Sequence, residues 1–397
     1  MGDPVSVDAV AESPILSLID QIFRLREQGE TVLGLHIGEP DFETPTGIRE
    51  AAFRAMNEGF THYVSAQGMP DLRAAIAGRL AARHHVPAEA DDVVVLSAKF
   101  AIYATLLATV GPGDEVLLPD PTYLFEQPVQ LVGARPVFVP LRPDFSLDEG
   151  ALRAAVTPRS KMLILVSPAN PTGRVLRAEE VRAALEVARD HHLTVVSDET
   201  YESLIYEGTH VSPASVADRE VSVVTIGSFS KLYAMTGWRA GFAVAPPEIR
   251  SRLVKVMEHT LTCIPPFVQK ACLWALEHAG PDEERFRAVF RERRDHLLGR
   301  LSRVEGLTTV RPEGAFYVFP RYDLPIPSGE FCTRLLGEEQ LAVVPGVAFG
   351  PHGEHHVRIS YSSPVEALDE GVDRIERFLL RHRPGRLGAG PRAPGPF

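Results

Sequence analysis

The sequence predicts an α/β protein that has a mainly parallel, seven-stranded sheet and a second, smaller α+β domain. Three observations lead to this prediction. The chain has 397 residues, a length at which about two domains are expected. Seven short apolar runs recur between residues 93 and 245, and most are near-continuous, as in strands that are covered on both faces. Helical patterns lie between many of these runs, which is the alternation typical of an α/β fold.

The elements of the large domain follow from this alternation. Leu72, Ile76 and Leu80 recur at helical spacing and mark the buried face of one helix. The seven runs predicted to be strands are residues 93–96, 115–118, 136–139, 161–166, 194–197, 221–226 and 240–245.

The two ends of the chain have a different pattern. Pro14 follows a serine and precedes apolar residues at helical spacing, which predicts a capped amphipathic helix, and residues 32–37 are predicted to be a strand. After about residue 247 long helices prevail, and the one over 283–303 is long enough to connect two domains. The remaining expected elements are short strands at 315–319, 341–344 and 356–361 and helices near 328–337 and 364–382.

We therefore expect four parts. They are an N-terminal arm with part of the small domain over 1–45, a large domain over 46–290, a small C-terminal domain over 291–380 and a disordered tail over 381–397. Disorder is expected in the tail because it is rich in Pro, Gly and Arg.

Composition and charge exclude several classes of partner. Apolar residues make up 45% and charged residues 23% of the chain, the balance of an ordinary globular enzyme. The formal charge of −11 disfavours binding to nucleic acid or an anionic membrane, and no apolar run approaches the length of a membrane span. The three cysteines form no CxxC motif, so a reducing cytoplasm is expected. No metal site is expected, because the two histidine pairs are adjacent rather than four residues apart.

One segment, residues 225–239, carries a candidate chemical centre. A predicted strand ends there in small and hydroxyl residues, and a lysine and an arginine follow. Ser228, Ser230 and Arg239 can donate hydrogen bonds to a phosphate. Lys231, one of only five lysines, would stand beside that phosphate on a turn, where it could form a Schiff base. Taken alone, the spacing fits a loop with a surface lysine and arginine equally well.

Two further strand ends add to this centre. Asp198 directly follows an apolar strand, and the carboxyl ends of strands face the crevice in which α/β sheets bind ligands. A carboxylate is what pyridoxal 5'-phosphate (PLP) needs at its ring nitrogen. Asn170 follows another buried strand in a turn rich in Pro and Gly, where an Asn is usual turn chemistry; its amide could instead bind a cofactor oxygen.

With these residues assembled, the chain resembles the class I/II aminotransferases, the aspartate aminotransferase-like family of fold-type I PLP enzymes. The resemblance covers roughly residues 13–380. Its specificity lies in the order of the motifs, since NPTG alone is a weak signal. The motifs are GEPDF at 38–42, GPGDEV at 111–116, NPTG at 170–173, DETY at 198–201, SFSK at 228–231, TGWR at 236–239, PEGAFY at 312–317 and VRIS at 357–360.

The resemblance implies a role for each residue around the cofactor ring. Lys231 would form the Schiff base with PLP and later move the proton between the substrate Cα and the cofactor carbon. Asp198 would pair with the ring nitrogen, and its pKa should then be low because the protonated ring is an opposite charge in contact. Asn170 and Tyr201 would donate to the ring 3-oxygen. Tyr123 would stack on the cofactor, or would only pack in the core.

The resemblance also implies a phosphate site that two subunits share. Tyr63 matches a tyrosine that reaches the phosphate of the neighbouring subunit, so a homodimer with shared active sites is expected. The other phosphate ligands would be Ser228, Ser230, Arg239 and the backbone N–H groups of Ala98 and Lys99 at the start of a helix.

On the substrate side, Arg358 would bind the α-carboxylate in a bidentate manner, together with the Gly38 N–H and Asn170. Ile37 would stand near the substrate side chain, as would His36, which the family does not lead us to expect. In some relatives the position of Lys99 recognises the distal carboxylate of aspartate or glutamate. The alternative is that Lys99 only supports the phosphate loop.

The activity that the resemblance implies is a ping-pong transfer of an amino group from an L-amino acid to a 2-oxo acid. A second hypothesis is another PLP reaction on the same scaffold, such as elimination, decarboxylation, cyclisation or oxidation, because a fold does not fix a reaction. A PLP-binding regulator of DNA is not expected, since the chain is acidic and only about a dozen residues precede the first helix.

Overall fold

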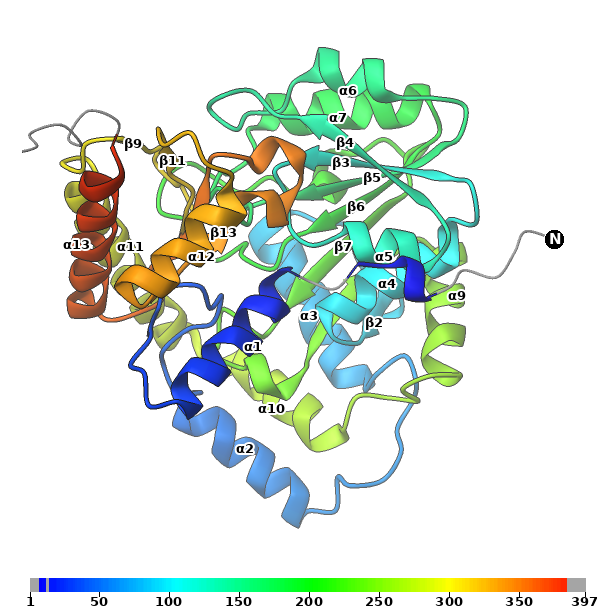
Figure 1. Ribbon diagram of the computed structural model, residues 1–397. Helices are drawn as coiled ribbons and strands as arrows, with labels where there is room; N and C mark the ends of the chain where they lie inside the picture. Colours follow the sequence, from blue (N-terminus) through cyan, green and yellow to red (C-terminus); the bar gives the residue numbers. More distant parts are fainter. Residues whose placement is uncertain (1–6, 12–13, 384–397) are drawn as a thin grey trace, which may run out of the picture.

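A seven-stranded sheet forms the centre of the computed structural model, which describes residues 7–11 and 14–383 (Figure 1). In spatial order its strands are β2 (Val93–Val95), β8 (Gly241–Val244), β7 (Val223–Ser228), β6 (Thr194–Asp198), β5 (Ser160–Val166), β3 (Glu115–Asp120) and β4 (Arg135–Pro140). β8 runs antiparallel to both of its neighbours, and every other pair is parallel. The predicted α/β class and the mainly parallel sheet of seven strands are confirmed.

Helices cover both faces of this sheet, which explains why its strands are apolar throughout (Figure 1). Successive side chains of a strand point to opposite faces. In β5, Met162 and Ile164 therefore pack with α4 (Ala98–Thr109) and α9 (Pro247–Glu258). Leu163 and Leu165 pack on the other side. The helices there are α6 (Glu149–Ala155), α7 (Ala178–Asp190) and the short α8 (Pro213–Val216), while α5 (Glu126–Leu131) lies on the α4 side.

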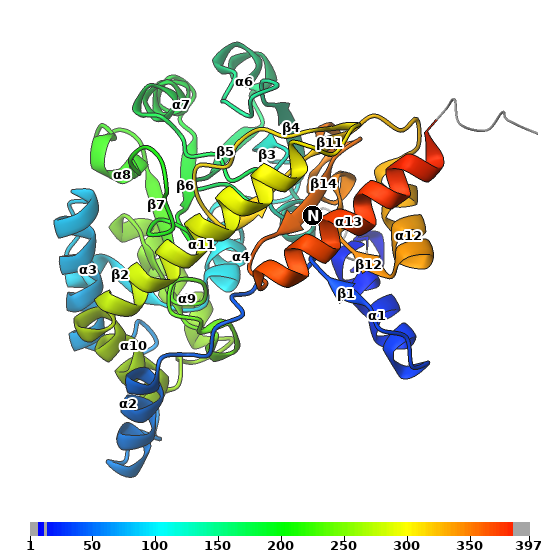
Figure 2. The same cartoon turned by 90° about the vertical axis from the view of Figure 1, so that its left-hand side faces the viewer.

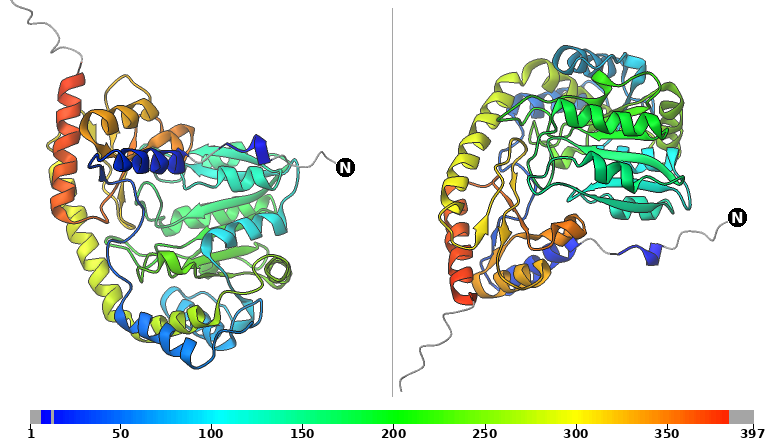
Figure 3. Two further views of the ribbon diagram at one scale, coloured as in Figure 1. Left: turned by 60° about the horizontal axis from the view of Figure 1, so that its bottom comes forward. Right: turned by 90° about the horizontal axis from the view of Figure 1, so that it is seen from above.

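The second part of the molecule is built from both ends of the chain. The strands are β1 (Leu33–Gly34), β9 (Leu307–Thr308), β10 (Tyr317–Val318), β11 (Arg321–Tyr322), β12 (Leu341–Ala342), β13 (Val344–Pro345) and β14 (Val357–Ser360), and the helices are α1 (Pro14–Glu27), α12 (Ser328–Glu339) and α13 (Val365–His382). β1 pairs in parallel with β12, so the N-terminal segment joins the C-terminal one. Leu18 and Ile22 of α1 pack in the same apolar cluster as Leu336 of α12, and Figure 3 shows these two helices side by side.

The long helix α11 (Gly280–Leu301) runs along both parts and lies beside α13 (Figure 2). Its Arg293 donates two hydrogen bonds to Asp41, at 2.7 and 2.8 Å. Nearer its C-terminal end, Arg300 pairs with Asp369 and Asp373 of α13. The proposed domain boundary at residue 290 falls inside this continuous helix. The remaining helices are α2 (Thr46–Asn57), α3 (Pro70–His84) and α10 (Pro266–His278).

Several predicted elements differ from the structure in extent. Of the strand expected over 32–37, only Leu33–Gly34 pairs as a strand, because the chain then changes partner from β12 to β14. The Leu35 N–H still donates to Ala342 of β12, whereas the Leu35 carbonyl accepts from the Ser360 N–H and the His36 carbonyl accepts from Arg358, both of β14. The strand expected over 341–344 is divided between β12, which pairs with β1, and β13, which pairs with β14. Of the tail, α13 continues to His382, and residues 384–397 lie outside the described part. Within the described ranges, no helix combines the length and apolarity needed to cross a membrane.

The hydrogen bonds of Glu115, at the start of β3, allow a test of what stabilises the sheet. Its buried carboxylate accepts hydrogen bonds from Arg135 at 2.5 Å, Thr157 at 2.7 Å and Arg159 at 3.0 Å. Burial raises the pKa of this carboxyl, but the Arg135 bond and the others outweigh it and lower the pKa to about 2. Glu115→Gln should therefore reduce the free energy of unfolding by roughly 1–3 kcal/mol at pH 7, measured by urea denaturation.

The stability that Glu115 contributes should depend on pH. A carboxylate whose pKa is lowered by folding contributes stability above its unfolded pKa, and this contribution is lost as the pH falls toward about 2. The difference between Glu115→Gln and the unmodified protein should shrink over that window. The control is Glu149→Gln, whose exposed pair with Arg153 should be worth under about 1 kcal/mol. An equal loss in both variants would contradict the account.

Candidate functional site

A cavity of about 290 Å³ lies at the carboxyl ends of β5, β6 and β7 and beside the N-terminus of α4. Val166, Asp198 and Ser228, the last residues of these three strands, all line it. All but one of the site residues predicted from the sequence line this single cavity. They are Ile37, Gly38, Ala98, Lys99, Tyr123, Asn170, Asp198, Tyr201, Ser228, Ser230, Lys231, Arg239 and Arg358.

Lys231 follows β7 and points its amine toward the cavity wall formed by residues 36–38. Its Nζ donates a hydrogen bond of 2.5 Å to the carbonyl oxygen of Gly38. Burial lowers the pKa of Lys231 to about 8, and the nearby positive charges of Arg358 and Arg239 act in the same direction. With this pKa roughly a tenth of the amine is unprotonated at pH 7, a far larger share than for an ordinary lysine, and the unprotonated form is the one that acts as a nucleophile or base.

Asp198, the last residue of β6, is the buried acid of the cavity. Both of its side-chain hydrogen bonds come from Thr200, whose N–H and Oγ1 lie 3.1 and 2.6 Å from the same oxygen, Oδ1. No described residue donates a hydrogen bond to the second carboxylate oxygen, Oδ2. Burial raises the pKa of Asp198, and the Thr200 bonds oppose this rise. The low pKa expected with a protonated ring in contact stays a prediction, because it needs that added positive charge.

Arg358 of β14 is buried, and its guanidinium is fixed in place. Nη1 donates to Asn170 Oδ1 at 3.1 Å and Nη2 donates to the His36 carbonyl at 2.6 Å. The aromatic rings of Tyr317 and Phe349 flank the guanidinium at 4.6 and 5.0 Å. The buried Nε has no partner among the described residues. A charged donor that is held but incompletely bonded is suited to a ligand carboxylate.

Tyr317 of β10 is a site residue that the sequence reasoning missed. Its hydroxyl lies 2.7 Å from that of Tyr201, and both tyrosines are buried and line the cavity. Burial raises the pKa of Tyr317 to about 12, so the phenol stays protonated. A Cβ at residue 38 would meet the Tyr317 hydroxyl at 2.3 Å, so only glycine fits there. The available signal was the PEGAFY motif, which ends at this tyrosine. The other lining residues without a predicted role are Ile19, Ile102, Leu124, Val166 and Thr200.

One end of the cavity is rich in hydrogen-bond donors and positive charge. Ser228, Ser230, Arg239, Lys99 and the N-terminus of α4 all line it. The first N–H groups of a helix have no partner within the helix, and the preceding Ser97 side chain does not cap them. Such a set fits a phosphate dianion, the buried Asp198 fits a protonated ring nitrogen, and the unprotonated Lys231 amine fits an aldehyde. The residues present therefore fit PLP.

Three predicted residues sit at the margin. Tyr123 lines the cavity but also packs edge-on against Phe125, so stacking on a cofactor and core packing both stay open. Ile37 lines the cavity and is 46% exposed. Tyr63 does not line the cavity, and its side chain is 86% exposed in the single chain. A function for Tyr63 at a phosphate therefore needs a second subunit.

Comparison with known proteins gives consistent results. The family model described as aminotransferase class I and II matches residues 30–375. The chain is 40% identical to the aspartate aminotransferase of Pyrococcus abyssi, over 94% of this chain and 97% of that protein. The structure of the Thermus thermophilus aspartate aminotransferase with maleate matches at 36% identity and a TM-score of 0.89, over 94% of this chain and 98% of that chain. The structure of the aromatic aminotransferase of Pyrococcus horikoshii matches at 40% identity and a TM-score of 0.86, over 91% of this chain and 99% of that chain.

Members of this family use PLP and act on an amino acid and a 2-oxo acid. The agreement covers the fold, the order of the motifs and nearly the full length of the relatives. By sequence and by structure, the chain belongs to the class I and II aminotransferases, the PLP-dependent enzymes of fold type I.

Proposed function

We propose that this aminotransferase takes aspartate or glutamate as a substrate and that Lys231 is its covalent cofactor ligand and proton carrier. The observation that supports this most is the Lys231 amine, whose pKa burial lowers to about 8, in the same cavity as Asp198 and the phosphate-binding donors. Among the five lysines, only Lys231 and Lys99 line that cavity.

The proposed cofactor contacts follow from the chemistry of each side chain. Asp198 would hold the ring nitrogen, Asn170 and Tyr201 would donate to the ring 3-oxygen, and Tyr123 would cover one face of the ring. The phosphate would bind to Ser228, Ser230, Arg239 and the N–H groups of Ala98 and Lys99. When bound, PLP supplies an electron sink for the negative charge that develops at the substrate Cα.

The substrate would be held by the opposite end of the cavity. Arg358 would take the α-carboxylate, with its guanidinium already oriented by Asn170 and the His36 carbonyl. Preorganised donors cost little entropy when the ligand binds. Lys231 would then remove the Cα proton, a step for which an unprotonated amine near neutral pH is suited.

Lys99 supports the choice of an acidic substrate. It lines the cavity from the first turn of α4, where its ammonium could reach a distal carboxylate. The relatives include proteins named aspartate aminotransferase, one of them solved with the dicarboxylate maleate. Another relative is named an aromatic aminotransferase, so the scaffold alone does not decide the substrate.

We also propose a cytoplasmic homodimer in which each subunit completes the other's site. The exposed ring of Tyr63 supports the shared site, because an aromatic side chain at 86% exposure is available to a partner. The cytoplasmic assignment is supported by the three cysteines, which are all unpaired.

Lys231→Ala should abolish covalent capture of PLP and lower kcat by at least about a hundredfold, because general-base catalysis is worth that much or more. Mass spectrometry after borohydride reduction should find the cofactor on the unmodified chain and not on the variant. The matched control is Lys255→Ala, which removes an exposed lysine of α9 and should retain both properties. Cofactor fixed to the Lys231→Ala chain would refute the assignment.

A mixture of two inactive variants tests the shared site. If Tyr63→Ala and Lys231→Ala chains exchange subunits, one of the two sites in a hybrid dimer carries no mutation. Activity should then return toward about a quarter of the unmodified level, since half of the dimers in a random mixture are hybrids with one intact site. Subunit exchange is verified by native mass spectrometry. Verified exchange without recovered activity would place Tyr63 outside the partner's site.

Lys99→Ala should lower kcat/KM for aspartate and glutamate by about ten- to a hundredfold and leave alanine nearly unchanged. The reason is the loss of one charge-assisted hydrogen bond, worth about 1.5–3 kcal/mol. The measured quantity is the ratio of kcat/KM for acidic and neutral substrates, because a defect in cofactor binding cancels in it. An unchanged ratio would mean that Lys99 serves only the phosphate loop.

A further inference from the structure

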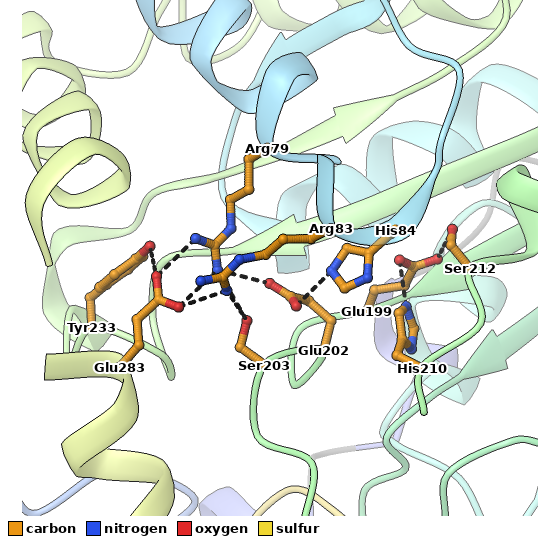
Figure 4. Close-up of polar contacts among 10 residues, drawn as sticks. All are labelled: Arg79, Arg83, His84, Glu199, Glu202, Ser203, His210, Ser212, Tyr233 and Glu283. Carbon is orange, nitrogen blue, oxygen red and sulfur yellow. Dashed lines mark hydrogen bonds and ion pairs between the residues drawn. The ribbon is translucent and has the colours of Figure 1, made fainter. Parts of the chain in front are cut away.

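A buried polar cluster, in which only Arg83 at the edge is exposed, lies behind the cavity, and its members are not among the site residues described above. Figure 4 shows its 10 side chains, which bond to one another. None of them lines the cavity. The members of this buried polar cluster are Arg79, Arg83 and His84 of α3; Glu199, Glu202 and Ser203 after β6; His210 and Ser212 before α8; Tyr233 after β7; and Glu283 of α11.

The cluster is joined to the cavity through neighbouring residues of the chain. Asp198 and Tyr201 line the cavity. Glu199 and Glu202, the residues that follow them, instead turn their side chains into the cluster (Figure 4). The loop over 198–203 therefore presents one face to the cavity and the other to the cluster.

Glu199 is held on both of its carboxylate oxygens, and it is only 1% exposed. One carboxylate oxygen accepts hydrogen bonds from Ser212 Oγ at 2.7 Å and from Ser197 Oγ at 2.9 Å. The other lies 2.9 Å from His210 Nε2. In the described part of the chain, only Thr200 of the same loop bonds to the Asp198 side chain, and no residue outside the loop does. The position of the Asp198 carboxylate thus depends on what holds the loop.

The second half of the cluster holds the other end of the loop. His84 Nε2 lies 2.8 Å from Glu202, and Arg79 bonds both to Glu202, at 3.4 Å, and to Glu283, at 2.8 Å. Tyr233, two residues after Lys231, donates to Glu283 at 2.5 Å. The rings of His84 and His210 pack edge to face, with their centroids 4.9 Å apart, and this contact connects the Glu199 half of the cluster with the Glu202 half.

The charges of the cluster balance only if an imidazole is protonated. Three carboxylates, those of Glu199, Glu202 and Glu283, are matched by the two guanidinium groups of Arg79 and Arg83. Burial alone lowers the pKa of His210, but the charge of Glu199, with which it also bonds, and the charge of Glu202 outweigh it, so the pKa is raised. Protonation of His210 would supply a third positive charge in contact with Glu199, whose carboxylate is otherwise held, among the described residues, by the hydroxyl groups of Ser197 and Ser212.

We propose that Glu199 and His210 are positioning residues: as a buried ion pair they hold the loop that carries Asp198 and Tyr201 at the geometry the cofactor requires. This inference rests on the function proposed above for Asp198 and Tyr201. Supporting contacts of this kind matter because catalytic groups must be held within about 0.5 Å of their productive positions.

The test compares His210→Gln with the unmodified holoenzyme. Glutamine keeps a donor near Glu199 but removes the positive charge. We expect kcat to fall about tenfold, less than the hundredfold that a 1 Å misplacement can cause, while KM changes less than about twofold, because Arg358 and its partners are untouched. The second readout is the pH midpoint of the bound cofactor's visible absorbance. It should rise, because losing a nearby positive charge favours the cofactor's protonated form.

Two further variants make the result decisive. Ser212→Ala removes one hydrogen bond to Glu199 without changing the charge, so kcat should fall severalfold with little change in the pH midpoint. This variant replaces His210→Gln in the test if His210→Gln does not fold. The matched control is Glu115→Gln, a buried carboxylate at the opposite end of the sheet, which should lose stability but keep kcat and the midpoint.

A purely structural cluster would give a different result. If His210→Gln and Ser212→Ala lower the melting temperature but keep the unmodified kcat and midpoint, the inference is overturned, and so it is if only KM changes. Asp198→Ala separates this failure from a failure of the proposed function. If that variant keeps more than about a tenth of kcat, where electrostatic stabilisation should be worth at least a hundredfold, the role of Asp198 itself is wrong.

Discussion

Parallel pairing of β5, β6 and β7 is the constraint on which the site depends. In register, Val166 lies opposite Asp198 and Asp198 lies opposite Ile226. Strands that run in one direction must end at one edge, so the turns after β5, β6 and β7 meet there although Asn170, Asp198 and Lys231 are far apart in the sequence. This is the general location of ligands in open α/β sheets.

The cavity gathers more positive than negative side chains, and this imbalance has a chemical consequence. Lys231, Arg239 and Arg358 line it together, against the single buried acid Asp198. Burial and the two arginines disfavour a proton on Lys231 and lower its pKa. The positive charges that suit a phosphate and a carboxylate therefore add to the effect of burial on the pKa of this amine.

Much of the fold and the cofactor end of the cavity could be predicted, because the signals are local. An apolar run that ends in Asp198, or in Ser228 to Lys231, can be recognised without knowing its neighbours. Tyr317 was missed because its contact with Gly38 joins residues 279 positions apart, and its motif does not reveal which residue it touches. The same holds for the Glu199–His210 pair, where only the fold brings a histidine to a buried carboxylate. The strand over 32–37 was overestimated for the converse reason, since its apolar residues reflect burial rather than continuous pairing.

The two ends of the cavity are built from different parts of the chain. The end proposed to bind the cofactor comes from the turns after β5, β6 and β7 and from α4, whereas the end proposed to bind the substrate comes from residues 36–38 and β14. Arg358 joins the two ends, because it bonds both to Asn170 after β5 and to the His36 carbonyl. α11 stabilises both sides, through Glu283 in the buried polar cluster and through Arg293 on Asp41 of the GEPDF loop. Under the proposed function, substitutions at Ile37 and Lys99 would therefore alter contacts with the substrate side chain and leave Arg358 and Asp198 in place. Such a separation would allow relatives of one scaffold to be named for aspartate and for aromatic amino acids.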